Sequence, residues 1–323
     1  DADVKTFADL LIQKKNIIIC WAMGITQQKN GVGNVQEIVN LLLLKGSIGK
    51  TGSGTCPVRG HSNVQGDRSV GIMHYVSKPL NQALKKVFGF DAPKKAGFDT
   101  VHCVQAMHEN RAKVFIALGG NFVSAVSDTN YTAEALQNCD LTVSIATKLN
   151  RGHLITGKTA LILPTLGRTE MDATNGKARF VTVENSMGKV HQSKGGRMPI
   201  SDGLKSEPSI VAALANTYFR GEHVVDWQAM GSDYELIRQK ISLVYEGYEE
   251  YSTRSKGSGF YLPNNARIGD FSKLPGGRAQ FSLNRLSEHN MDKDEFVLMT
   301  IRSHDQFNTT IYDMNDRYRG IHG

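Results

Sequence analysis

The chain has 323 residues, 40% hydrophobic and 21% charged, which is enough for one large or two medium-sized domains with cores of their own. This balance is typical of a soluble globular protein, and the longest apolar run, Ile17–Met23, is too short to span a membrane. The net charge of +7 is scattered, without a long Lys/Arg block. That distribution argues against nucleic acid as a partner and leaves an anionic, phosphate-bearing ligand open.

The chain opens at Asp1 in a helical pattern and lacks the layout of a signal peptide, so we expect a fragment of a longer cytoplasmic protein. Its four cysteines, Cys20, Cys56, Cys103 and Cys139, form no CxxC or CxxxC pair. This spacing predicts neither a disulfide framework nor a local zinc or iron–sulfur site. We expect Cys20, Cys103 and Cys139 to be buried free thiols.

Helical and strand patterns alternate at short spacing over the first half of the chain, and the strands are short, continuous apolar runs. This alternation predicts a parallel sheet that helices cover on both faces. In the second helix we expect Asn34 as the N-cap, with Glu37 completing a capping box. Helices are expected at 3–14, 34–45, 100–111, 131–139, 207–219 and 227–251, and strands at 16–20, 113–121, 140–146, 159–164 and 296–301.

The segment 49–67, "GKTGSGTCPVRGHSNVQGD", is too polar and Gly-rich to be core. It is not a P-loop, because Leu44 occupies the place of the first glycine and the segment follows a helix. A nucleophile pair of Cys56 and His61 has no third orienting group in the sequence. Arg59 can bind a carboxylate or phosphate bidentately, and His61 can exchange a proton near neutral pH. A solvated loop with Arg59 in a structural ion pair remains the alternative.

Three polar segments follow predicted strands: 21–31, 119–121 and 147–153. In parallel sheets, ligands bind at the carboxyl ends of the strands. Glycines at 119–120 would let the backbone approach a phosphate, and Asn121 could bond a base or a ribose, although an ordinary glycine turn fits equally well. The segment 300–310, "TIRSHDQFNTT", is dense in Arg and amide donors, as expected for a ligand-facing surface or a domain interface.

Together these segments resemble the molybdopterin-dependent oxidoreductases, in particular the formate-dehydrogenase-like alpha subunits. "NLLLLKGSIGKTGSG" followed by "PVRGHSNVQG" is the most specific part of the resemblance. "LGGN", "TKLNRGHLITGKTALILPTLGRTEMD" and "TIRSHDQFNTTIYDMNDRYRGI" recur in the family's order, so the resemblance extends over essentially the whole chain.

The resemblance implies two molybdopterin guanine dinucleotides around a molybdenum ion and a two-electron oxidation or reduction of a small anionic substrate. It places the metal ligand, and the cysteines of any [4Fe–4S] cluster, upstream of this chain, so we expect the chain alone to be inactive. An electron-transfer partner is expected, and no nucleic acid or membrane span. The alternatives are a non-catalytic cofactor- or nucleotide-binding module of the same fold and an ordinary nucleotide-dependent enzyme.

The resemblance also suggests roles for individual residues. Arg59 matches an arginine that lies beside the metal and assists the substrate carboxylate, and His61 would relay a proton. His61 stands where a formate dehydrogenase has glutamine, which argues against carrying formate over as the substrate. The expected cofactor contacts are Met23, Gln27, Asn63, Gly119, Gly120, Asn121, Thr147, Lys148, Asn150, Arg302, Gln306 and Asn308.

The expected fold class is α/β, with parallel-sheet dinucleotide-binding domains of the molybdopterin oxidoreductase type and the start of a C-terminal β-barrel domain. Residues 1–75 would be part of a central α/β domain with the Gly-rich cofactor loop, and 76–250 a second α/β cofactor-binding domain. An irregular connection would occupy 251–294, and the incomplete barrel domain 295–323.

Overall fold

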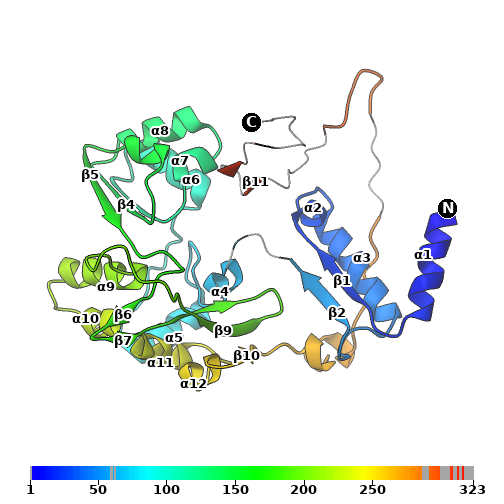
Figure 1. Ribbon diagram of the computed structural model, residues 1–323. Coiled ribbons are helices and arrows are strands. Elements are labelled where there is room, and N and C mark those ends of the chain that lie inside the picture. The colour runs from blue at the N-terminus through cyan, green and yellow to red at the C-terminus, as the bar shows by residue number, and fades with distance from the viewer. Residues whose placement is uncertain are drawn as a thin grey trace. The chain divides into compact units, whose positions relative to one another are not determined.

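The computed structural model describes residues 2–58, 61, 63–285, 291–298, 306–307, 311–312 and 315. The chain divides into two compact units, each assembled from segments that are distant in the sequence (Figure 1). The first unit comprises Asp1–Ile72, Thr182–Ser193 and Arg238–Asp292, and the second Met73–Val181, Lys194–Ile237 and Lys293–Gly323. Helices and parallel sheets in the described residues confirm the predicted α/β class.

The first unit contains a two-stranded parallel sheet. β1 (Ile18–Trp21) pairs with β2 (Gly54–Pro57), and α3 (Gly31–Leu44) forms the crossover between them. The short helix α2 (Met23–Thr26) follows β1 directly. Because the strands are parallel, their carboxyl ends share one edge of the sheet, where the chain enters α2 and the loop after β2.

α3 begins before the position that the sequence predicts. Its N-cap is Asn30, whose side chain makes no capping bond, and Asn34 lies inside the helix. The Nδ2 of Asn34 donates to the carbonyl oxygen of Ile25 at 3.2 Å, and a carboxyl oxygen of Glu37 accepts from Asn284 at 2.9 Å. The predicted capping box is therefore wrong, because tertiary contacts use both side chains.

A second sheet of the first unit has the strand order β10–β9–β8. Its core is an aromatic cluster in which Tyr248, Tyr251 and Phe260 pack around Val190. The elements of this unit not yet named are α1 (Ala2–Gln13), α4 (Val64–Ser69), β8 (Val181–Glu184, in this unit from Thr182), β9 (Lys189–Ser193), α11 (Tyr234–Val244, in this unit from Arg238), α12 (Tyr251–Ser255), β10 (Phe260–Tyr261), η2 (Ala266–Ile268) and η3 (Pro275–Gly277).

The second unit is built on a three-stranded parallel sheet in the order β3–β4–β5. These strands are β3 (Val114–Leu118), β4 (Leu141–Ala146) and β5 (Thr159–Pro164). α6 (Thr100–His108) and α8 (Thr129–Gln137) contribute a core against which Phe115 of β3 packs. On β4, Val143 and Ile145 form a second core cluster with Ile210 of α9 (Glu207–Tyr218).

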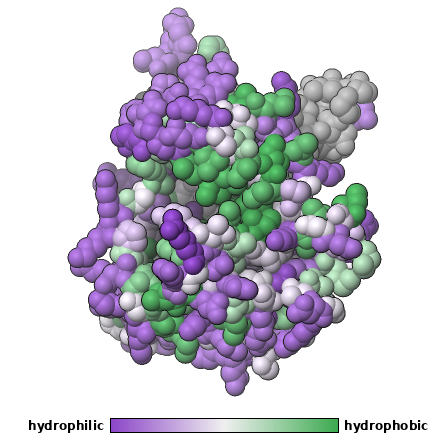
Figure 2. Space-filling view, turned by 90° about the vertical axis from the view of Figure 1, so that its left-hand side faces the viewer, coloured by the Kyte–Doolittle hydropathy of each residue, from purple (hydrophilic) through white to green (hydrophobic). Residues whose placement is uncertain are grey.

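The expected covering of both sheet faces is correct for the central strand β4 but wrong for β3. Val143 and Ile145 of β4 are buried, whereas Val114, Ile116 and Leu118, alternate residues of the edge strand β3, are each more than half exposed. The difference arises because Ile210 packs on β4. Apolar side chains that reach the surface appear as green areas on the face shown in Figure 2.

Two further expectations from the sequence are wrong in the described residues. The helix expected at 227–251 is divided into α10 (Trp227–Ser232) and α11, because Asp233 between them has an extended backbone with φ −134° and ψ 107°. Of the strand expected at 296–301, the described residues 296–298 form no strand. The second unit also contains α5 (Lys78–Phe88), α7 (Phe122–Ala125), η1 (Arg151–Leu154), β6 (Ala173–Thr174), β7 (Lys177–Ala178) and the antiparallel pair β11 (Gln306–Phe307) and β12 (Ile311–Tyr312).

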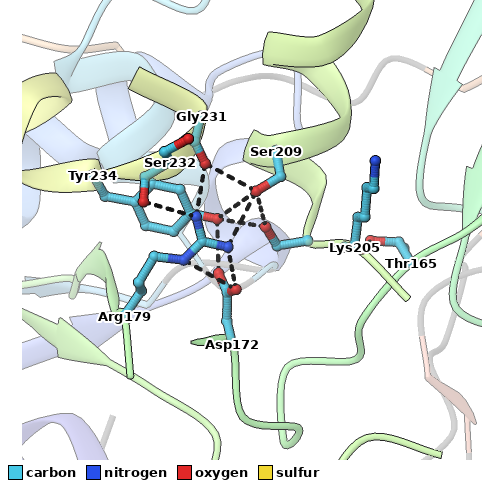
Figure 3. Close-up of polar contacts among 9 residues, drawn as sticks. Thr165, Asp172, Arg179, Lys205, Ser209, Gly231, Ser232 and Tyr234 are labelled. Atoms are coloured by element: carbon cyan, nitrogen blue, oxygen red, sulfur yellow. Dashed lines mark hydrogen bonds and ion pairs between the residues drawn. The ribbon is translucent and has the colours of Figure 1, made fainter. Parts of the chain in front are cut away.

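A buried arginine cluster holds β7 and the segment after it against α9 and α10 (Figure 3). The Arg179 guanidinium forms an ion pair with Asp172 and donates to the carbonyl oxygen of Gly231 at 2.7 Å and to Ser209 Oγ at 3.2 Å. It also stacks on the Tyr234 ring at 4.3 Å. This one side chain therefore connects three segments that are distant in the sequence.

Candidate functional site

The turn after β3 contains Gly119, Gly120 and Asn121. Both glycines have positive φ, 69° and 77°, a conformation that other L-residues rarely adopt. The Gly119 amide still donates to the carbonyl oxygen of Ile145 on β4 at 2.8 Å, so the chain turns only after the sheet has ended. The Asn121 side chain does not cap the helix α7 that follows. The turn therefore exposes backbone at the carboxyl end of a parallel strand, where ligands bind in α/β proteins.

The side-chain oxygen of Asn121 is buried and has no hydrogen-bond partner among the residues that the structure describes. Leaving a buried acceptor unpaired costs about 1–3 kcal/mol, so such atoms are usually satisfied by water or a ligand. Asn121 Oδ1 lies 3.2 Å from where a side chain on Gly152 would begin. An acceptor without a donor, in a turn at the end of a strand, is the strongest local indication of a ligand site in the second unit.

Asn150, in the loop after β4, ties that loop to the turn after β3. Its Nδ2 donates to the Gly120 carbonyl oxygen at 3.4 Å, and its Oδ1 accepts from the Gly152 amide at 2.9 Å. Thr147 and Lys148 in the same loop are exposed. A cavity of about 30 Å³ lies between the two loops and holds no more than a water-sized group, so a larger ligand would lie over the exposed strand ends.

Glu207, the first residue of α9, reaches the same turn, although the sequence did not single it out. Its Oε1 lies 3.8 Å from where a side chain on Gly119 would begin. Burial raises the pKa of the Glu207 carboxyl. A partly desolvated carboxylate beside a glycine turn can accept two N–H donors from a ligand. In the sequence, Glu207 looks like an ordinary acidic residue in the first turn of a helix, and only the fold brings it to β3.

In the first unit, Met23 and Gln27 lie immediately after β1, as the sequence predicts. Both are exposed, and Gln27 Nε2 donates to Met23 Sδ at 3.5 Å. His61, in the loop after β2, is exposed as well. Since β1 and β2 are parallel, these side chains follow the same edge of the sheet. Arg59 lies outside the described residues.

Both polar atoms of the Asn63 side-chain amide form hydrogen bonds within the protein. Its Oδ1 accepts from the Glu184 backbone amide at 3.0 Å, and its Nδ2 donates to Asp67 Oδ1 at 3.2 Å. Asn63 also has a positive φ of 62° as the N-cap of α4. In this arrangement Asn63 fixes the start of α4 against β8.

The Gly-rich loop before β2 lines a cavity of about 820 Å³ within the first unit. Gly49 in this loop has φ 75°, and a side chain there would begin 2.5 Å from the Gly269 Cα, so close backbone packing explains this glycine. Glu184 in the cavity wall is only 6% exposed. Its Oε1 accepts from Gln65 Nε2 at 2.7 Å, while its Oε2 is buried and has no partner in the described part of the chain. The sequence did not single out Glu184 either.

The remaining predicted contacts fall at the end of the chain. Arg302 and Asn308 lie outside the described residues, and Gln306 is described only as part of β11. In the described part of the chain, no cluster of three or more His, Cys, Asp and Glu side chains is arranged to hold a metal ion. None of the helices in these described ranges has the length and apolarity needed to cross a membrane.

Parallel sheets with polar loops at their carboxyl ends define an α/β protein of the kind that binds ligands at this edge of the sheet. Residues 4–197 match the family model described as molybdopterin oxidoreductase. The match covers more than half of the chain, which therefore belongs to the molybdopterin oxidoreductase family, as the resemblance in its sequence predicts. Membership implies a molybdopterin cofactor with molybdenum. The unpaired acceptor of Asn121 and the open turn of Gly119 and Gly120 fit an extended ligand with N–H and hydroxyl donors.

The relatives are longer proteins. Over 323 residues, 100% of this chain, it is 46% identical to a Mycobacterium tuberculosis (strain H37Rv) protein named as an uncharacterised oxidoreductase. It is 42% identical to protein YdeP of Escherichia coli K12, over 99% of the chain. The chain spans 42% of the length of each of these two relatives. A Staphylococcus aureus (strain MRSA252) protein, whose name provisionally assigns it to the formate dehydrogenases, is 28% identical over 67% of this chain and 22% of its own length.

Proposed function

We propose that this chain is the cofactor-binding portion of a molybdenum oxidoreductase that carries two molybdopterin guanine dinucleotides. The enzyme would oxidise or reduce a small anionic substrate by two electrons, as formate-dehydrogenase-like proteins do. The observation that carries the proposal is the convergence of the unpaired Asn121 Oδ1 and the Glu207 carboxyl on the glycine turn after β3. Asn121 Oδ1 has no donor among the described residues, and both groups are acceptors suited to the donor-rich end of a guanine nucleotide.

In the second unit, each group of the turn has a role in binding. The Glu207 carboxylate would accept the N1–H and N2–H of a guanine, because a carboxylate presents two acceptor oxygens side by side. Asn121 Oδ1 would accept a ribose hydroxyl, and Gly119 and Gly120 would let the phosphate linkage approach the backbone. Lys148, exposed in the neighbouring loop, would offset phosphate charge. Thr147 and Asn150 complete the loop.

In the first unit, Met23 and Gln27 would lie along a second dinucleotide. The family resemblance assigns Arg59 to the substrate, where its planar guanidinium would hold a carboxylate-like anion in two parallel hydrogen bonds. His61, whose side chain is exposed, would exchange a proton with the substrate through a ring nitrogen. When bound, the molybdenum centre would supply the two-electron exchange. An iron–sulfur cluster and a partner protein would carry the electrons onward, with ligands outside this chain.

The proposal is tested on the full-length protein by releasing and analysing its cofactor. Acid oxidation should yield a fluorescent pterin, metal analysis should find molybdenum or tungsten, and hydrolysis should release guanine nucleotide in equal amount to the pterin. Absence of both pterin and metal would reject the proposal. Pterin without guanine nucleotide would leave the family assignment standing and reject the dinucleotide.

A second experiment separates an enzyme from a binding module of the same fold. Arg59→Ala should abolish turnover with artificial electron acceptors while pterin and metal contents stay at the wild-type level. Arg220→Ala, which removes an exposed arginine of the second unit, is the matched control and should leave turnover unchanged. An Arg59→Ala protein that turns over at the wild-type rate contradicts the assignment of the substrate to Arg59.

A further inference from the structure

Cys20 and Cys56 lie directly opposite one another in the parallel sheet of the first unit. Cys20 belongs to β1 and Cys56 to β2, and the two are register partners. Register partners on adjacent strands point to the same face, and the strands lie about 4.8 Å apart. Disulfides join residues whose Cα atoms are about 4.4–6.8 Å apart, so the backbone spacing suits a bond between these residues. In the structure both are free thiols.

The accessibility of this pair differs from the expectation for Cys20. The sequence predicts Cys20 as a buried thiol because its neighbours are apolar, but its side chain is exposed and that of Cys56 is half-buried. The pKa of the Cys56 thiol is raised, mainly by burial and further by its hydrogen bond to the Cys20 thiol. Cys20 is therefore the thiol that a reagent in solution reaches first.

The other two cysteines provide an internal comparison. Cys139 is fully buried in the core cluster of α6 and α8, and Cys103 packs against that cluster. Burial raises the pKa of both thiols. A fully buried thiol such as Cys139 is inert toward oxidants, whereas Cys103 is half-buried, so the expectation that it is buried is wrong. Of the four cysteines, Cys20 is the exposed one, and its register partner is a second thiol.

We propose that Cys20 and Cys56 form a redox-responsive dithiol that low-molecular-weight disulfides convert into an intramolecular disulfide between β1 and β2. The proposal rests on the register of the strands and on the exposure of Cys20, and it does not depend on the cofactor. Nothing in the proposed oxidoreductase chemistry uses either thiol.

The reaction is a two-step thiol–disulfide exchange. The Cys20 thiolate attacks one sulfur of oxidised glutathione, forms a protein–glutathione S–S bond and expels one glutathione thiolate. The Cys56 thiolate then attacks the Cys20 sulfur, closes the protein disulfide and expels the second glutathione. Two protein thiols lose two electrons and two protons, and one glutathione disulfide gains them to become two thiols.

The position of the pair gives the bond a consequence for the proposed site. β1 ends one residue after Cys20 and leads into Met23, and β2 ends one residue after Cys56 and leads toward Arg59 and His61. A covalent bond here would fix the starting points of both loops at once. If the proposed function is correct, the oxidised and reduced proteins should therefore differ in turnover.

The test uses the reduced full-length protein incubated with oxidised glutathione, acid-quenched, alkylated and digested for mass spectrometry. We expect a cross-linked peptide pair that contains Cys20 and Cys56, formed at least about tenfold faster than any modification of Cys103 or Cys139. Cys56→Ser should stop at a stable glutathione adduct on Cys20, and Cys103→Ser should behave as wild type.

Two results would overturn the proposal. One is wild-type protein in which Cys20 and Cys56 stay alkylatable after long incubation. The other is wild-type protein in which glutathione remains on Cys20 while Cys56 stays free, since the second thiol would then be unable to reach the first. Both results are read on the wild-type protein, so they hold even if a variant fails to fold. Neither depends on bound cofactor, so they remain distinct from a failure of the proposed function.

Discussion

Glu207 places a carboxyl oxygen 3.8 Å from the point at which a side chain on Gly119 would begin. This contact brings the start of α9 to the turn after β3, where the buried side-chain oxygen of Asn121 finds no donor within the described ranges. The neighbouring loop after β4 is tied to the same turn through Asn150 and Gly120. Three separate segments therefore converge on the end of β3, and this convergence makes the turn testable as a ligand site.

Replacing Glu207 by Gln should weaken cofactor retention in the full-length protein. The substitution keeps the size of the side chain but removes the charge and replaces an acceptor by a donor. A hydrogen bond to a charged group is worth about 1.5–3 kcal/mol, so retention should fall roughly tenfold to a hundredfold. Cofactor retention is measured as the pterin content of the protein after gel filtration. Glu222→Gln, at an exposed position, is the control. Equal pterin in both variants would refute the role of Glu207.

A methyl group on Gly119 should have two separable effects. Alanine at a φ of 69° costs stability, about 1–2 kcal/mol, because its Cβ crowds the backbone. Gly221→Ala is the matched control, since Gly221 has a φ of 73° and open space around it. Urea denaturation should show a similar loss for both variants, and only Gly119→Ala should lower the pterin content. If Gly221→Ala loses as much pterin, instability alone explains the effect.

The raised pKa of Glu207 should make the free energy of unfolding of the cofactor-free protein depend on pH. Burial raises the pKa of this carboxyl above its ordinary value of 4.5 in the folded state. As pH rises from about 4.5 to the folded-state pKa, the folded state holds more protons than the unfolded one, so stability falls. The stability that the protonated Glu207 carboxyl contributes is fully present below pH 4.5 and is lost above the pKa of this group in the folded state. Urea denaturation across this pH range should show a shallower fall in the free energy of unfolding for Glu207→Gln than for the wild type. The same pH dependence in both proteins would contradict the raised pKa of Glu207.

The Arg179 cluster should dominate the stability of the second unit. The Arg179 and Asp172 side chains are only 11% and 19% exposed, so Arg179→Met leaves a buried carboxylate without its partner. Breaking such a pair costs about 3–5 kcal/mol. Lys158→Met is the control, because the Lys158–Asp140 pair is 71% and 51% exposed and worth about 1 kcal/mol or less. Urea denaturation measures the free energy of unfolding of both variants. Equal losses for Arg179→Met and Lys158→Met would show that the Arg179 cluster does not dominate the stability of the second unit.

The sequence predicts the elements of the second unit well where hydrophobic patterning decides them. The strand expected at 140–146 is observed as β4, Leu141–Ala146, because its alternate apolar residues Val143 and Ile145 are buried against Ile210. The division of the helix expected at 227–251 was not predicted. Asp233 adopts an extended conformation after α10, and its Oδ1 accepts from the Glu235 amide at 2.9 Å in the first turn of α11. Local polar bonding here overrides the apolar periodicity.

The candidate site was predicted only in part. Gly119, Gly120 and Asn121 could be recognised because they follow a strand directly, so the local sequence carries the signal. Glu207 and Glu184 could not be recognised in this way, because tertiary packing alone brings them to a glycine turn and to a cavity wall. The exposure of Cys20 was missed for a similar reason, since apolar neighbours predict burial of a strand but do not say which face is covered.

The central claim is that the loops after β3 and β4 hold a guanine dinucleotide form of the molybdenum cofactor. The most direct measurement compares pterin, metal and guanine nucleotide in full-length wild-type protein and in the Asn121→Ala variant, with Asn138→Ala, at the end of α8, as the control. Wild type and control should contain pterin and guanine nucleotide in equal amounts together with molybdenum or tungsten, and Asn121→Ala should lose most of all three. Wild-type protein without guanine nucleotide, or an Asn121→Ala variant that keeps its full content, would contradict the claim.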